Sequence, residues 1–98
     1  MRNPFFCFKC LEYFAPEVLV SEEHSMAADW WSFGTLMFEM ITGLPPFYSQ
    51  DVQVMCQKII SEKLKIPETM SSEAALLLSG LLEKDPAFVD FHLFFLFF

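Results

Sequence analysis

Basic residues are scarce in this sequence of 98 residues. Six Lys and Arg stand against 13 Asp and Glu, which gives a net charge of −7 and an isoelectric point near 4.5. Such a charge opposes binding to the phosphate backbone of nucleic acids and to anionic lipid surfaces. Nucleic acid is therefore not an expected partner, and basic proteins or peptides are favoured instead.

Cysteine is also scarce, with three residues in the chain. Cys7 and Cys10 form a C-x-x-C pair, but a structural zinc site needs four ligands. Cys56, His24 and His92 do not supply a second pair. No metal site is expected, and an odd, sparse set of cysteines suits a reducing compartment.

Long apolar runs are missing too. No stretch reaches the roughly 20 residues that a membrane-spanning helix needs, and no small-residue cleavage site follows the apolar N-terminal stretch. Neither a membrane span nor a secretory signal is expected, so the expected location is the cytoplasm, with the nucleus as the alternative. The length leaves room for one domain at most.

Phenylalanine divides the chain. Ten of its 13 phenylalanines lie in residues 1–14 and 88–98. One explanation is that these two ends are apolar termini that anchor on a core. The other is that they are translated from a nucleotide sequence that was never selected to encode protein. The nearly unbroken Phe and Leu of the C-terminal run favour the second explanation. We therefore leave residues 1–10, an apolar N-terminal segment, and residues 87–98, a Phe-rich tail, unassigned.

Three helices are expected between these ends, and no strand pattern competes with them. The first spans 28–41 and is apolar on nearly every face, which is typical of a helix at the centre of a larger structure. The second spans 51–60 with amphipathic spacing. The third spans 72–82, with Ser71 as N-cap and Asp85-Pro86 as the stop. Residues 15–19 are expected to be irregular or a short helix, so the predicted fold is all-α.

The acidic residues alone predict no catalytic set, because no two are spaced to converge and no nucleophile lies nearby. Most are expected on a solvated surface. Glu39 is different, because a charge within an apolar helix suggests that it has a partner.

Three motifs occur in a specific order and spacing: E-Y-F-A-P-E-V-L at 12–19, A-D-W-W-S-F-G at 28–34 and G-L-P-P-F at 43–47. Together they resemble the C-terminal lobe of eukaryotic protein kinases, most of all the AGC group of Ser/Thr kinases, which includes the cAMP-dependent and ribosomal-protein kinases. The resemblance covers residues 11–86, about three quarters of the chain. The resemblance implies that the chain is part of a kinase domain, from the end of the activation loop through helices F, G and H. The intact parent kinase would have two lobes and an α+β fold.

The resemblance also implies structural roles. Asp29 corresponds to the residue that begins helix F and accepts backbone N–H bonds from the catalytic loop; the simpler interpretation is a charge at a helix N-terminus. Trp30 and Trp31 correspond to core positions that seat the A-P-E segment. The remaining structural positions are Ala15, Pro16, Glu17 and Gly34.

A second group of positions corresponds to substrate contacts. Leu11 and Phe14 match the pocket for the substrate residue just after the phosphorylated one. Glu12 and Glu39 match acidic positions that pair with substrate arginines in basophilic kinases. Carboxylate and guanidinium groups form strong paired hydrogen bonds, which explains the acidic residue type.

The parts that transfer phosphate are not found in these 98 residues. The sequence has no glycine-rich phosphate loop, strand lysine, H-R-D motif or D-F-G motif. Ser32-Phe33-Gly34 is no degenerate D-F-G, because it follows A-P-E. No catalytic residue and no cofactor site are therefore expected here, whereas the intact parent would use ATP and Mg²⁺.

The C-terminal end departs from the family as well. In the family, the glutamate of the A-P-E motif, which is Glu17 in this chain, pairs with a buried arginine. This chain has Val89 at the position of that arginine, and its only arginine is Arg2. Loss of one partner of a buried pair costs about 3–5 kcal/mol, which predicts a loosely folded chain. Three interpretations remain open: an inactive piece of an AGC-like kinase, a non-catalytic helical binding module, and an unproductive translation product.

Overall fold

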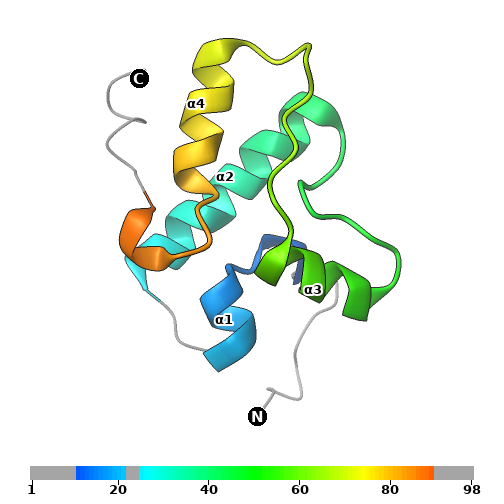
Figure 1. Ribbon diagram of the computed structural model, residues 1–98, viewed down its shortest axis with the longest axis vertical. Helices are drawn as coiled ribbons and strands as arrows, with labels where there is room; N and C mark the ends of the chain where they lie inside the picture. Colours follow the sequence, from blue (N-terminus) through cyan, green and yellow to red (C-terminus); the bar gives the residue numbers. More distant parts are fainter. Residues whose placement is uncertain (1–10, 22–24, 90–98) are drawn as a thin grey trace.

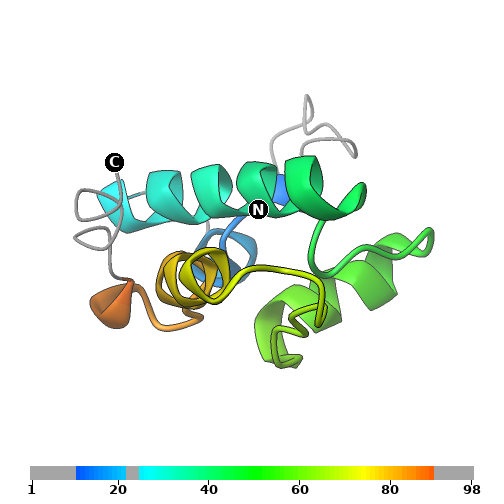
Figure 2. The same ribbon diagram turned by 90° about the horizontal axis from the view of Figure 1, so that it is seen from above.

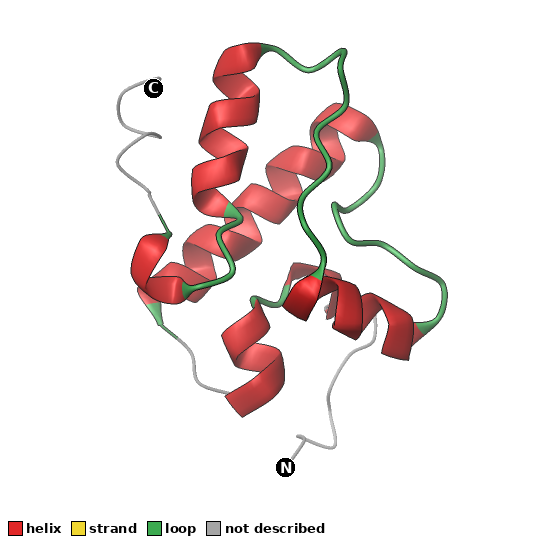
Figure 3. Ribbon diagram, in the orientation of Figure 1, coloured by secondary structure: helices red, strands yellow, loops and turns green. Residues whose placement is uncertain are grey.

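The computed structural model describes residues 11–21 and 25–89, which form helices and contain no strand (Figures 1 and 3). The predicted all-α fold is confirmed for these residues. The elements in chain order are a 3₁₀ turn η1 (Leu11–Tyr13), α1 (Pro16–Ser21), α2 (Met26–Thr42), α3 (Val52–Ser61), α4 (Ser72–Leu81) and a 3₁₀ turn η2 (Pro86–Phe88).

Helix α2 begins at Met26 rather than at the predicted Ala28, because Ser25 is its N-cap. The Ser25 hydroxyl accepts a hydrogen bond from the backbone N–H of Ala28 at 3.3 Å. The helix ends at Thr42, one residue beyond the predicted range, and its C-cap Gly43 adopts the left-handed conformation with φ of 94° and donates its N–H to the Glu39 carbonyl at 2.7 Å.

Helix α4 begins at the predicted residue 72, and α3 begins at Val52, one residue after the predicted start. The carboxylate of Asp51 caps α3 by accepting from the N–H groups of Gln53 at 2.9 Å and Val54 at 3.4 Å. The Ser71 hydroxyl caps α4 by accepting from Ala74 N–H at 3.1 Å. Residues 15–19 fall mostly within α1, so the short-helix alternative is the one observed.

Helix α2 lies along one side of the molecule, and α1, α3 and α4 lie on the other side (Figure 2). The core fills the space between these two layers. Its largest fully buried side chains are Trp31 from α2, Ile59 from α3 and Leu78 from α4. Burial of this apolar surface, rather than the helices' own propensities, holds the short helices in place.

The outer face of α2 remains apolar and exposed in the described structure. Met26 and Met40 are 68% and 69% exposed, and Leu36 and Ile41 are also exposed. The apolar pattern around the whole helix therefore leaves apolar surface uncovered on the side away from the core.

Thr35 provides a test of this packing. It is fully buried in α2, and its Oγ1 atom forms no hydrogen bond within residues 11–21 and 25–89. A buried hydroxyl without a partner costs about 1–3 kcal/mol, so Thr35→Val should raise the free energy of unfolding by about 1 kcal/mol. Urea denaturation followed by circular dichroism measures the change.

The matched control is Thr42→Val. The Thr42 hydroxyl donates to the Phe38 carbonyl at 2.9 Å and accepts from Leu44 N–H at 3.4 Å. This variant should lose stability because the same substitution removes hydrogen bonds. Equal effects of the two substitutions would contradict the prediction.

Candidate functional site

The turn η1 packs on α2 and brings together two side chains that lie 26 residues apart. The Tyr13 hydroxyl donates a hydrogen bond to Oε1 of Glu39. The Ser32 hydroxyl, also on α2, donates to the backbone carbonyl of Tyr13 at 2.6 Å and lies 3.1 Å from that of Ala28. These contacts fix η1 against the middle of α2.

Glu12 lies at the same site. Partial burial raises the pKa of the Glu12 carboxyl above its usual value, and the negative charge of Glu39 raises it further. Two carboxylates that repel each other at a partly desolvated surface favour the binding of a cation. The two glutamates that the sequence analysis selected therefore lie close enough to interact electrostatically, and their role as substrate contacts stays a prediction.

The sequence analysis did not select Tyr13 as a site residue. Its position directly after Glu12, in the E-Y motif, is the only local signal. A partly buried tyrosine needs a partner for its hydroxyl, but the identity of that partner depends on the packing of η1 on α2.

The remaining candidate residues lie in and around the core. Ala15 is 1% exposed, Pro16 is buried, and Phe14 packs against the core. Glu17 is half-buried, with its Oε2 atom inside the protein. The prediction for Leu11 concerns a side chain outside the described part of the structure.

The two tryptophans occupy different environments. Trp31 is 1% exposed and stacks on Phe47, with ring centroids 6.1 Å apart and an interplanar angle of 14°. Trp30 is half-buried and meets Phe33 edge to face at 5.9 Å. Asp29 is exposed in the first turn of α2, where its charge also suits the helix dipole.

Gly34 lies at the closest approach of α2 and α4. A Cβ atom at this position would be 2.9 Å from Leu81 Cβ and 3.2 Å from Leu82 Cδ2. The absence of a side chain at residue 34 therefore sets the distance between the two helices.

Neither a metal-ligand cluster nor a glycine-rich loop occurs in the described part of the chain. Residues 11–21 and 25–89 contain no group of three or more His, Cys, Asp or Glu that could hold a metal ion. Gly34 serves helix packing and Gly43 ends a helix, so neither belongs to a phosphate loop. The C-x-x-C pair lies outside these ranges, as do both histidines. No helix within them is long and apolar enough to cross a membrane.

Comparison with known proteins identifies the class. The protein kinase domain family matches residues 7–88, a range slightly longer than the predicted 11–86 at both ends. This chain belongs to the protein kinase domain family, with its described helices in the C-terminal lobe, and the predicted resemblance is confirmed.

Its relatives are Ser/Thr kinases. The chain is 60% identical over 74 residues to Protein kinase 2 of Dictyostelium discoideum, covering 76% of this chain and 15% of that protein. It is 57% identical over 75 residues to a RAC family serine/threonine-protein kinase homolog of the same organism, and this match covers 76% of this chain and 17% of that protein. The identity to human RAC-beta serine/threonine-protein kinase is 48% over 75 residues, and this match covers 76% of this chain and 16% of that protein. The match thus spans about one sixth of each relative's length.

Proposed function

We propose that this chain forms the part of a Ser/Thr protein kinase that binds the basic side chains of a protein substrate. The intact protein would transfer the γ-phosphate of ATP, with Mg²⁺, to Ser or Thr in basic sequence contexts. The observation that carries the proposal is the hydrogen bond from Tyr13 to Glu39 beside the second carboxylate of Glu12.

The chemistry of the site suits an arginine side chain. The hydroxyl of Tyr13 orients the Glu39 carboxylate, and a carboxylate can accept several hydrogen bonds at once. A guanidinium offers five N–H donors in one plane and is weakly hydrated, so it pairs with such an oriented carboxylate better than an ammonium does. Repulsion between the two glutamates is relieved when this cation binds.

We also propose that residues 1–98 alone do not transfer phosphate, because the sequence contains no glycine-rich loop, H-R-D or D-F-G. The remainder of a kinase domain is then the partner that completes the enzyme, in the cytoplasm or the nucleus. Incubation of the purified chain with labelled ATP and a basic peptide should give no incorporation above background.

The second candidate function is a non-catalytic module that binds basic peptides without any phosphate transfer. It is favoured by the acidic site, which is built entirely from η1 and α2 within this chain. The third interpretation, an unproductive product, predicts neither binding nor a soluble helical chain.

Binding of an arginine-rich peptide tests the site. We expect the double variant Glu12→Gln, Glu39→Gln to bind at least 10-fold more weakly than the unmodified chain, since it loses charge-assisted hydrogen bonds. The control, Glu68→Gln with Glu73→Gln, changes the net charge equally at exposed positions. Calorimetry measures both affinities. Equal weakening would mean attraction by net charge alone and would exclude a specific site.

The pH dependence is a second readout of the same experiment. Arginine binds the ionised carboxylate, and the raised pKa of Glu12 means that this group is protonated at a higher pH than an ordinary glutamate. Affinity should therefore fall on acidification, beginning above pH 4.5, the usual value for glutamate. By reciprocity, bound peptide should lower the Glu12 pKa in an NMR titration. An unchanged pKa would argue against contact with Glu12.

A further inference from the structure

Lys84 lies between α4 and η2 and reaches the C-terminal end of α3. Its Nζ atom donates a hydrogen bond to the carbonyl of Ile59 at 2.7 Å and a longer one to that of Lys58 at 3.4 Å. The same atom lies 3.8 Å from the ring centroid of Phe47 and 5.4 Å from that of Trp31. Carbonyl oxygens and aromatic ring faces both present negative charge, so this environment suits an ammonium group.

The end of α3 needs hydrogen-bond donors from outside the helix. The last four carbonyls of a helix have no partner within it, and the helix dipole makes this end negative. The Lys58 carbonyl accepts from the backbone N–H of Glu62 at 2.9 Å. The Ile59 carbonyl accepts from the Lys84 side chain. Lys84 therefore completes the end of α3 from a position 25 residues further along the chain.

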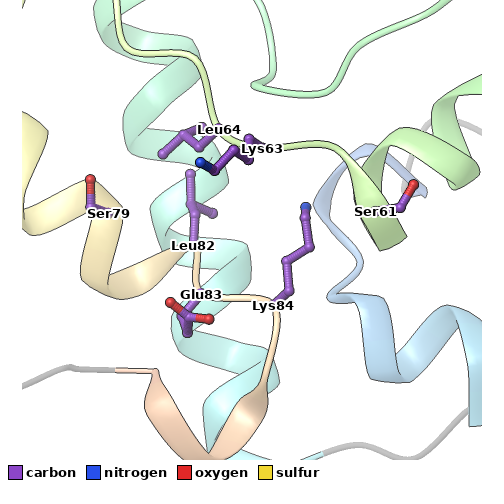
Figure 4. Close-up of a pocket in the computed structure, with 7 residues that line it drawn as sticks. All are labelled: Ser61, Lys63, Leu64, Ser79, Leu82, Glu83 and Lys84. Atoms are coloured by element: carbon purple, nitrogen blue, oxygen red, sulfur yellow. The ribbon is translucent and has the colours of Figure 1, made fainter.

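A cavity of about 390 Å³ lies beside this contact. Figure 4 shows the Lys84 side chain extended from the segment after α4 toward the end of α3, where Ser61 lies. The other lining residues come from the end of α3 or the end of α4 and the segments that follow them: Lys63, Leu64, Ser79, Leu82 and Glu83. Open space therefore separates the ends of α3 and α4, and the Lys84 side chain crosses it.

The rest of α3 is held by apolar packing. Helix α3 packs on α1 and buries Met55 and Ile59, whereas α2 packs on α4. Fewer packed contacts must break where a helix end borders a cavity, so such an end can open while the rest of the fold stays intact.

We propose that the charged Lys84 side chain is a latch for the C-terminal end of α3. While the ammonium group holds the Ile59 carbonyl and lies over the Phe47 ring, this end stays docked on the core. When these contacts break, the end of α3 opens locally, α2 and α4 stay packed, and the cavity extends toward Phe47.

Hydrogen exchange of single backbone amides, followed by NMR in the full chain, measures this opening. The variant Lys84→Met keeps the apolar stem and removes the ammonium group. The amides of Ile59 and Ile60 should exchange at least about 10-fold faster in this variant, the lower limit for loss of a hydrogen bond from a charged group. The amide of Phe38, in α2, should exchange at an unchanged rate.

Two further variants separate the latch from general effects of charge. Lys65→Met removes the same charge at an exposed position and should leave exchange in α3 unchanged. Lys84→Arg keeps a cation with several N–H donors and should retain most of the protection.

Three results would overturn the proposal, in chains shown to be helical by circular dichroism. The first is unchanged exchange at Ile59 and Ile60 in Lys84→Met, or the same acceleration in Lys65→Met. The second is equal acceleration in all helices of Lys84→Met, which would mean a general contribution to stability. The third is exchange in Lys84→Arg as fast as in Lys84→Met, because charge would then not hold α3.

Discussion

Replacement of Trp31 by alanine should lower the free energy of unfolding by about 3–5 kcal/mol, the usual cost of deleting a buried aromatic side chain. Trp31 is 1% exposed, belongs to the core cluster with Ala15 and Leu78, and stacks on Phe47. The loss is comparable with the whole stability of a small domain. We therefore expect the variant to lose most of its helical circular dichroism at room temperature.

The neighbouring tryptophan is the matched control. Trp30 has the same side chain one residue earlier in α2, but it is half-buried and contacts Phe33 edge to face. Trp30→Ala should cost about 1 kcal/mol, in the middle of the range for ordinary substitutions. Urea denaturation of the two variants gives the comparison. Equal losses would show that Trp31 does not have the central position that the packing assigns to it.

Replacement of Gly34 by alanine should destabilise the chain even though alanine favours helices by about 1 kcal/mol over glycine. The new Cβ would lie 2.9 Å from Leu81 Cβ. This neighbouring atom is attached directly to the α4 backbone, so the contact can be relieved only by moving α4 away from α2. Overpacking of this kind costs about 1–3 kcal/mol, and we expect a net loss in a urea titration.

Two further variants show whether the effect comes from space. Gly43→Ala tests backbone strain alone, because Gly43 has φ of 94° and no atom lies within 4 Å of the place that a Cβ would occupy; it should cost about 1–2 kcal/mol. Adding Leu81→Ala to Gly34→Ala should not restore stability, because alanine keeps the Cβ atom that causes the clash. A stable double variant would refute the proposed contact.

Several features follow from the sequence because they depend on residues close together in the chain. The capping residues Asp51 and Ser71 lie where a polar side chain precedes an apolar helical pattern; the start of α4 is predicted correctly, and that of α3 lies one residue after the predicted one. The predicted start of α2 is wrong by two residues, because its cap Ser25 precedes the predicted range. The ordered motifs at 12–19, 28–34 and 43–47 are enough to identify the kinase family. The selection of Glu12 depends on that resemblance alone, whereas Glu39 also stands out in the sequence as a charge within an apolar helix.

Only the tertiary structure decides which distant residues meet. The bond between Tyr13 and Glu39 joins residues 26 positions apart, and Lys84 meets carbonyls 25 and 26 positions away. The buried hydroxyl of Thr35 and the close approach at Gly34 likewise depend on how α2 packs. Helix periodicity and capping are determined by neighbours within about four residues. The relative placement of helices depends on which apolar faces can be buried together, and that is a property of the whole chain.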